Sequence, residues 1–242
     1  KNNIQIREKL ENILATYKRK HVIANDYELT AQDLQYLIKK FKSEIKKYFK
    51  IEFPDSCKEQ LWGAIEAVFK SWNGKRVIQY RNIENIPHDW GTAVNVQTMV
   101  FGNLGETSAT GVAFTRNPSN GNNNIYGEWL KNAQGEDVVA GIRTPNPINE
   151  SSKTNRTKNS ETLQKKWPNI YKKLLKIKNK LEKHYKDMQD VEFTIESGTL
   201  WMLQTRKGKR TGEAAIKIGV EMNDEKLITQ QELIDRIISK NI

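Results

Sequence analysis

The stretch that most constrains the fold of this chain is DVEFTIESGTLWMLQTR, residues 190–206. It predicts two short strands joined by a tight turn, because aromatic and branched residues alternate with polar ones on both sides of a Ser-Gly pair. Side chains on a strand alternate between two faces, so the register between the strands decides which polar groups meet. The sequence therefore predicts an antiparallel hairpin whose two faces differ in chemistry.

Two turn lengths are compatible with this hairpin. A two-residue loop sets Glu192 opposite Leu203, whereas a three-residue loop sets Glu192 opposite Met202. The three-residue form favours glycine at its third position, where φ is positive, and Gly198 is at that position. We therefore expect the three-residue loop.

In that register the hairpin has an apolar face and a polar face. The apolar face carries Val191, Phe193, Ile195, Trp201 and Leu203. The polar face carries Asp190, Glu192, Gln204 and Arg206, with Thr194, Leu200 and Met202 between them. A slip of one residue would mix the two sets and bury charge, so the register itself predicts a polar cluster on one face.

This polar cluster has the chemistry of a metal–phosphate site. Asp190, Glu192 and Gln204 offer carboxylate and amide oxygens, which Mg²⁺ prefers when phosphate and water complete its shell. Arg206 adds a planar guanidinium that matches phosphate oxygens. The alternative is a cross-strand salt bridge on a solvated face, and the residue types alone do not decide between the two.

The first third of the chain is predicted to be helical, because apolar residues recur there at helical spacing. One helix surrounds residues 10–17. A second begins after Thr30, which can cap it, and a third begins after Ser56, with Glu59 as its capping-box partner. Apolar stripes of this kind are typical of a packed core rather than of a cofactor groove.

Beyond residue 72 the sequence favours strands separated by turn signals. The expected strands, besides the hairpin, lie at residues 92–102, 110–116 and 136–142. The fold class is therefore α+β, with a helical subdomain over residues 1–72. A mainly antiparallel sheet with flanking helices follows over residues 73–242.

The C-terminal half adds one irregular segment and three helices. Residues 149–160 are polar and poor in apolar residues, so we expect a mobile loop. A lysine-rich helix then runs to about Lys186 and is broken or restarted at Pro168. Two further helices are expected, one from about Glu213 and a short one capped by Thr229.

Composition limits the class of protein. Cys57 is the only cysteine, so no internal disulfide can form, and a reducing cytoplasm is the expected location. No apolar run approaches the roughly 18 residues of a membrane span. The formal charge of +11 on 242 residues is interpreted as a solvated lysine-rich surface, with a polyanion site as the alternative. The chain starts on Lys1 rather than methionine, which suggests a fragment of something longer.

Three long stretches resemble the pyruvate phosphate dikinase family. They are DWGTAVNVQTMVFGNLGETSATGVAFTRNPSNG, IYGEWLKNAQGEDVVAGIRTPNPI and DMQDVEFTIESGTLWMLQTRKGKRTG. The resemblance extends over roughly residues 25–240 and weakens at 149–160. It implies a partial ATP-grasp fold, in which two α+β lobes sandwich ATP, with ATP as substrate and Mg²⁺ as cofactor.

The family pattern also implies roles for individual residues. The metal and phosphate ligands fall on Asp190, Glu192, Gln204 and Arg206. The segment VQTMV resembles the strand that contacts adenine, which implicates Gln97, Met99 and Val100. Without the resemblance, Met99 would be expected in a core.

Two further acids enter through the resemblance. The segment QGEDVVAG supplies Glu136 and Asp137, which the resemblance places near the phosphates, and we count them with Arg206 as catalytic candidates. On their own they would be turn residues. Arg76 and Arg81 can reach anions, but no role is assigned to either.

The implied parent is a phosphotransferase that interconverts ATP, phosphate and pyruvate with AMP, diphosphate and phosphoenolpyruvate. Its implied partners are a phosphohistidine domain and a pyruvate-binding domain of the full-length chain, and the resemblance leaves open whether the parent is a homodimer. A glycine-rich phosphate loop with its lysine is missing, and His21, His88 and His184 lie outside any phosphotransfer motif. We therefore expect an incomplete ATP site and an inactive isolated fragment.

Two alternative functions remain. The first is the nucleotide-binding part of a phosphoenolpyruvate synthase, which shares the architecture. The residues of the quoted stretches favour the dikinase over the synthase. The second is a basic polyanion- or RNA-binding module. The aromatic residues fall in apolar stripes rather than on an evident stacking strand, so a nucleic acid is not an expected partner. A membrane is not an expected partner either, because no apolar run is long enough to span one.

Overall fold

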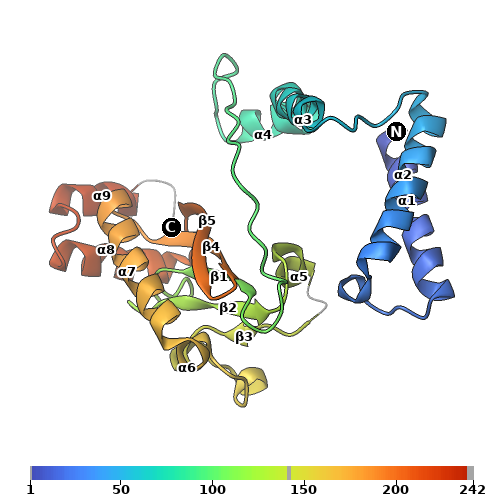
Figure 1. Cartoon of the computed structure of the whole chain (residues 1–242). Helices are drawn as coiled ribbons and strands as arrows, with labels where there is room; N and C mark the ends of the chain where they lie inside the picture. The colour runs from blue at the N-terminus through green and yellow to red at the C-terminus, as the bar shows by residue number, and fades with distance from the viewer. Residues whose placement is uncertain (1, 141–142, 239–242) are drawn as a thin grey trace. The chain divides into compact units, whose positions relative to one another are not determined.

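The computed structural model describes residues 2–140 and 143–238, and they divide into two compact units. The first unit is Lys1–Gln97 and is helical; the second is Thr98–Ile242 and combines a sheet with helices (Figure 1). The predicted α+β class is confirmed. The predicted subdomain boundary at residue 72 stays a prediction.

The first unit consists of helices with identifiable caps. They are α1 Asn2–Lys20, the 3₁₀ turn η1 Asp26–Glu28, α2 Ala31–Phe49, α3 Cys57–Ser71 and α4 Lys75–Ile83. Before α2, the Thr30 hydroxyl accepts from the Asp33 amide at 3.3 Å, and the Asp33 carboxylate accepts from the Thr30 amide at 2.8 Å. The Ser56 hydroxyl accepts from the Glu59 amide at 3.4 Å. Both predicted N-caps are confirmed.

Helix α3 buries none of its residues within this chain. Its large apolar side chains are exposed, Trp62 by 61% and Phe69 by 50%. In contrast, Arg81 on α4 is buried: its guanidinium lies 4.1 Å from the Trp72 ring centroid and donates to the Trp72 carbonyl at 2.5 Å. Arg81 is therefore committed to holding α4 against the end of α3.

The second unit is built on a five-stranded antiparallel sheet with the strand order β3-β2-β1-β4-β5. The strands are β1 Ala109–Phe114, β2 Tyr126–Lys131, β3 Asn146–Pro147, β4 Gln189–Glu196 and β5 Thr199–Lys207. The helices are α5 Gly135–Ala140, α6 Leu163–Lys166, α7 Pro168–Tyr185, α8 Gly212–Asp224 and α9 Gln230–Ile238. Two 3₁₀ turns, η2 Glu150–Ser152 and η3 Asn155–Thr157, lie between β3 and α6.

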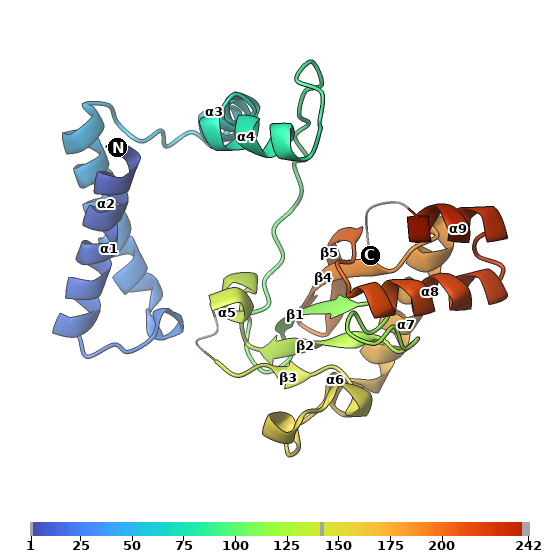
Figure 2. The same cartoon turned by 180° about the vertical axis from the view of Figure 1, so that it is seen from behind.

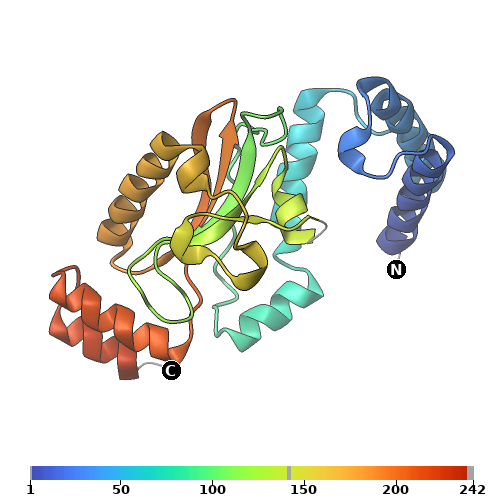
Figure 3. The same cartoon turned by 90° about the horizontal axis from the view of Figure 1, so that it is seen from below.

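One face of the sheet is packed against α7 (Figure 3). The buried side chains of this core are mainly Ala109, Ala113, Trp129, Val191, Phe193 and Ile195 on the strands and Ile170 and Leu174 on α7. A second cluster, formed by Met188, Ala214, Ile218, Met222 and Ile228, holds α8 and α9 side by side (Figure 2). The opposite side of the sheet, which carries Val112, Glu128, Glu192 and Gln204, is called the open face below.

A buried arginine ties α8 to the rest of the second unit. Arg116, which follows β1, has no exposed side-chain surface and donates to Glu182 on α7 and to Glu221 and Glu225 on α8, at 2.6 to 3.2 Å. Burial alone lowers the pKa of Arg116, but Glu225 and Glu182 outweigh it and raise the pKa. Lys178, also buried, has a lowered pKa because desolvation outweighs the attraction of Glu182.

Several predicted elements are confirmed, and two are wrong. Pro168 begins α7, α8 begins beside Glu213, and the Thr229 hydroxyl accepts from the Glu232 amide at 3.1 Å before α9. Residues 92–102 form no strand. Residues 136–140 belong to helix α5 rather than to a strand, and 141–142 lie outside the described residues.

The polar segment at 149–160 contains η2 and η3 and is fastened by Asn149. The Asn149 side chain is buried, donates to the Ile125 carbonyl at 2.7 Å and accepts from the Ser152 amide at 2.9 Å. The mobility of this segment stays a prediction. Within the two described ranges, no helix combines the length and the apolar character that crossing a bilayer requires.

Candidate functional site

The hairpin closes through a two-residue turn. Glu196 pairs with Thr199, and the turn residues Ser197 and Gly198 have φ values of 47° and 80°. Two successive positive φ values are typical of a type I′ turn, whose twist matches that of the flanking strands. The predicted three-residue loop is therefore wrong.

A β-bulge on β5 restores the polar alignment that the shorter turn would have lost. Phe193 pairs with Met202, but the next residue of β4, Glu192, pairs with Gln204, so Leu203 is an extra residue. Asp190 consequently pairs with Arg206. The four predicted polar residues share one face, as expected, although for a different geometric reason.

The apolar face differs from the prediction in its β5 residues. Leu200 and Met202 pack against the core with Val191, Phe193 and Ile195. Trp201 pairs with Thr194 and is 46% exposed, so it belongs to the open face. The prediction that Trp201 faces the core is wrong because the turn is one residue shorter than expected. The prediction for Leu203 is not tested by strand pairing, because Leu203 is the extra residue of the bulge.

Arg206 connects the two acids of the hairpin. Its Nε lies 2.7 Å from Asp190 Oδ2, and its Nη2 lies 3.4 Å from Glu192 Oε1. The hydrogen bond to Asp190 is the main cause of a raised Arg206 pKa. The cross-strand salt bridge that the sequence left as an alternative is thus present, and its members are the candidate ligands themselves.

The donor set suits a metal that arrives with its own ligands. Among the described residues, no group of three or more His, Cys, Asp or Glu side chains could hold a metal ion. Asp190, Glu192 and Gln204 supply hard oxygens from paired strands, which is the partial set that Mg²⁺ uses when phosphate and water fill its other positions. The residues therefore fit a magnesium–phosphate ligand better than a bare ion.

The predicted adenine-contacting residues lie at the division between the two units. Gln97 is the last residue of the first unit, whereas Met99 and Val100 follow Thr98, the first residue of the second. Met99 is 69% exposed and Val100 is half-buried. Met99 therefore lies on the surface of this chain and not in a core, where it would be expected without the resemblance.

Glu136 and Asp137 lie in the first turn of α5. The Asp137 carboxylate accepts from the Gln134 amide at 2.8 Å, which fixes the start of that helix, and Glu136 is exposed. In the part of the chain that the structure describes, no hydrogen bond or ion pair joins either acid to the hairpin residues. Their place near the phosphates stays a prediction.

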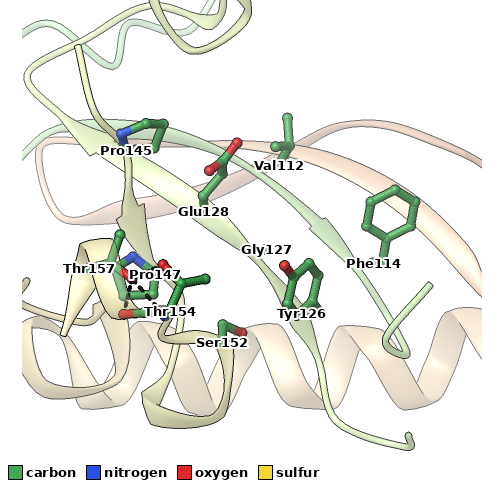
Figure 4. A pocket seen from close by; sticks show the side chains of 10 residues that line it. All are labelled: Val112, Phe114, Tyr126, Gly127, Glu128, Pro145, Pro147, Ser152, Thr154 and Thr157. Atoms are coloured by element: carbon green, nitrogen blue, oxygen red, sulfur yellow. Dashed lines mark hydrogen bonds between the residues drawn. The ribbon is translucent and has the colours of Figure 1, made fainter. Parts of the chain in front are cut away.

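The open face contains a hollow that the sequence did not reveal (Figure 4). It has a volume of about 230 Å³ and lies between strands β1–β2 and the residues around η2 and η3. Val112 pairs with Glu128 on one side and with Glu192 on the other, so the hollow borders the acids of the hairpin. Glu128 is exposed and adds a third carboxylate to this row. The aromatic residues of YGEWLK, between two turn signals, were the missed sign of a strand here.

Comparison with known proteins identifies the family. The model of the family described as "Pyruvate phosphate dikinase, AMP/ATP-binding domain" matches residues 10–174 and 149–227. The chain belongs to this family.

Relatives in the family are similar over nearly the whole chain. Pyruvate, phosphate dikinase of Rhizobium meliloti (strain 1021) is 53% identical over 230 residues, and that of Clostridium symbiosum is 52% identical over 233. The chloroplastic pyruvate, phosphate dikinase 1 of Arabidopsis thaliana is 48% identical over 229 residues. These matches cover 95%, 96% and 95% of this chain but only 26%, 25% and 22% of the relatives. The chain thus spans about a quarter of the length of its dikinase relatives, and the family match includes both units.

Proposed function

We propose that this chain is the nucleotide-binding portion of a pyruvate phosphate dikinase and binds Mg²⁺-ATP on the open face. The observation that carries the proposal is the alignment of Asp190, Glu192, Gln204 and Arg206 on that face, opposite the side packed against α7. We further propose that the second unit is one lobe of an ATP-grasp fold. The family match to an AMP/ATP-binding domain supports the choice of ligand.

Each hairpin residue has a role in this proposal. Asp190, Glu192 and Gln204 hold Mg²⁺, which supplies positive charge against the phosphates when it is bound. Arg206 exchanges part of its contact with Asp190 and Glu192 for the phosphate oxygens, to which its planar fork is matched. Because these groups are fixed by strand pairing, they need little rearrangement to stabilise charge that develops during transfer.

The adenine and the remaining acids are placed with the help of the resemblance. The backbone of Gln97, Met99 and Val100 reads the edge of the base, and the exposed Met99 side chain covers its apolar face. Glu136 and Asp137 act near the phosphates.

In the full-length parent, this portion supports transfer of the terminal diphosphoryl group of ATP to a histidine on a separate domain, which releases AMP. Inorganic phosphate then takes one phosphoryl group away as diphosphate, and the phosphohistidine passes the other to pyruvate. The overall path converts ATP, phosphate and pyruvate to AMP, diphosphate and phosphoenolpyruvate. A glycine-rich phosphate loop with its lysine is missing from this sequence, so the remaining phosphate contacts must come from another part of the parent. We propose that the isolated chain catalyses no overall reaction.

Titration calorimetry with Mg²⁺-ATP tests the proposal in two arms. The full-length parent is expected to bind, and its Glu192→Gln variant is expected to bind more weakly because one metal ligand loses its charge. The isolated chain is expected to bind weakly or not at all. Tight micromolar binding by the isolated chain would contradict the incomplete site, and equal binding by the variant would contradict the assigned metal ligand.

A phosphate-dependence assay on the full-length parent separates the dikinase from a phosphoenolpyruvate synthase. A dikinase consumes phosphate as a co-substrate, whereas the synthase releases phosphate by hydrolysis. The relatives support the dikinase, since the similar proteins described above carry that name. Turnover that does not depend on added phosphate would favour the synthase.

A further inference from the structure

Residues 98–108 form neither helix nor strand, since β1 begins at Ala109, yet their backbone is fastened on two sides. Most of these bonds come from side chains or from turns rather than from a strand partner. The segment begins with Thr98, Met99 and Val100, so its position decides where the proposed base-contacting residues lie.

The closed end of the hairpin provides the first set of contacts. The Glu196 carboxylate accepts from the Phe101 amide at 2.9 Å. The Gly198 amide donates to the Thr107 carbonyl at 2.8 Å. The neighbouring Ser197 amide donates to the Ser108 hydroxyl at 3.0 Å. The hairpin tip is therefore bonded along the segment rather than at one point.

The turn after β2 provides the second set. The Asn132 side-chain oxygen accepts from the Gly105 amide at 3.0 Å, and that of Gln134 accepts from the Gly102 amide at 3.4 Å. The Ala133 amide donates to the Gly102 carbonyl at 2.9 Å. A Cβ on Gly102 would lie 2.3 Å from the Ala133 carbonyl oxygen, so this close approach requires glycine.

We propose that Glu196 is a positioning residue that sets the backbone of Met99 and Val100 for the base of a bound nucleotide. The proposal rests on the proposed function. The Phe101 amide that Glu196 holds directly follows Val100, so movement of this bond moves the base-contacting backbone. Strand β4 carries Glu196 at one end and Asp190 near the other, and therefore fixes the base end of the site relative to its phosphate end.

The contact is suited to positioning rather than to folding. Phe101 is 38% exposed as a residue, and we expect water to replace Glu196 as the partner of its amide at little cost in stability. Water does not hold the amide in one place, however. Loss of the carboxylate should therefore affect recognition of the base more than the stability of the fold.

Two probes separate the base from the phosphates in the full-length parent: adenylyl imidodiphosphate and inorganic tripolyphosphate, each with Mg²⁺. Glu196→Ala is expected to weaken binding of the nucleotide about fivefold to tenfold, since one positioning hydrogen bond is lost. Its affinity for tripolyphosphate should not change. Glu196→Gln should bind both probes as the unsubstituted parent does, because an amide oxygen still accepts from Phe101.

Control variants keep the test decisive. Glu161→Ala removes an exposed carboxylate outside the site and should change neither affinity. Gln134→Ala, which removes the contact to Gly102, should reproduce the loss for the nucleotide alone and serves if Glu196→Ala does not fold. Circular dichroism checks folding of each variant.

The outcomes distinguish this inference from the proposed function. Equal weakening of both probes by Glu196→Ala, or no weakening of either, would overturn the positioning role while leaving the nucleotide site intact. Failure of the unsubstituted parent to bind either probe would overturn the proposed function itself. A loss confined to the nucleotide, rescued by Glu196→Gln, is the expected result.

Discussion

Glu192 lies directly opposite Gln204 because Leu203 is an extra residue on β5. If β5 ran regularly, without the bulge, a hairpin with the observed two-residue turn would pair Glu192 with Leu203, and Gln204 would lie on the opposite face. In the observed register Asp190 faces Arg206, and the two acids, the amide and the guanidinium project together. A turn and a bulge thus jointly determine the composition of the open face.

Replacement of Arg206 by lysine tests whether the guanidinium acts on phosphate. We expect Arg206→Lys to lower phosphoryl transfer in the full-length parent on the order of 100-fold, because a point charge replaces a planar fork. Folding should be unaffected, since the side chain is 56% exposed. Lys207→Ala, which removes the adjacent cation, is the matched control. Rapid-quench kinetics measures the rate, and an unchanged rate in Arg206→Lys would contradict the assigned role.

Substitutions at the two residues of the hairpin turn should change the free energy of unfolding in opposite directions. Ser197 has φ 47°, which asparagine tolerates better than serine, so Ser197→Asn should raise the free energy of unfolding by about 0.5 kcal/mol. Gly198 has φ 80° with open space around it, so Gly198→Ala should lower the same quantity by about 1 kcal/mol through backbone strain alone. Urea unfolding of both variants measures the difference. Equal stability of the two would argue against the type I′ turn.

Substitution of the buried Arg116 should lower the free energy of unfolding more than most other substitutions in the chain. Arg116→Met leaves Glu182, whose side chain is only 4% exposed, without its main counter-charge. We expect a loss of about 3–5 kcal/mol in the free energy of unfolding. Lys70→Ala, which breaks an exposed pair with Glu66, should change it by less than about 0.5 kcal/mol. A loss of similar size in both variants would contradict a special role for the buried cluster.

Asp187 predicts how stability depends on pH. Burial alone raises the pKa of Asp187, but Arg210, at 2.6 and 2.9 Å, outweighs it and holds the pKa below its ordinary value of 3.8. A depressed folded-state pKa contributes stability above the unfolded-state pKa, and this contribution disappears as the pH falls through the folded value. Arg210→Gln should therefore be destabilising at pH 7 and progressively less so below about pH 4.

Urea unfolding of the unsubstituted chain and Arg210→Gln between pH 7 and pH 3 measures this difference. A stability difference that stays constant over the whole range would show that Asp187 does not titrate differently in the folded and unfolded chains.

Much of the fold follows from local sequence signals. The caps at Thr30, Ser56 and Thr229 are short-range hydrogen bonds that need no tertiary partner, and Pro168 suits only the first turn of a helix. Strand β1 and both strands of the hairpin were also visible as alternating patterns. Such features depend only on residues that are close together in the sequence, so they can be predicted from the sequence alone.

The failures have a different physical origin. Residues 92–102 have strand-forming side chains, but their backbone finds no strand partner, and Phe101 and Gly102 bond side chains far along the chain. Residues 136–140 include two valines that favour a strand, but two acids at a helix N-terminus favour α5. The bulge at Leu203 depends on strand pairing, so the polar face was predicted correctly from an incorrect turn.

The dependence of the open face on strand register has an evolutionary consequence. Substitution within the hairpin alters one side chain, whereas gain or loss of one residue between Phe193 and Glu196, if no bulge absorbed it, would turn both acids toward α7. Natural variants of this region should therefore differ freely in the identity of many residues but hold their spacing constant. Selection should therefore act on the number of residues in the hairpin more strongly than on their identity.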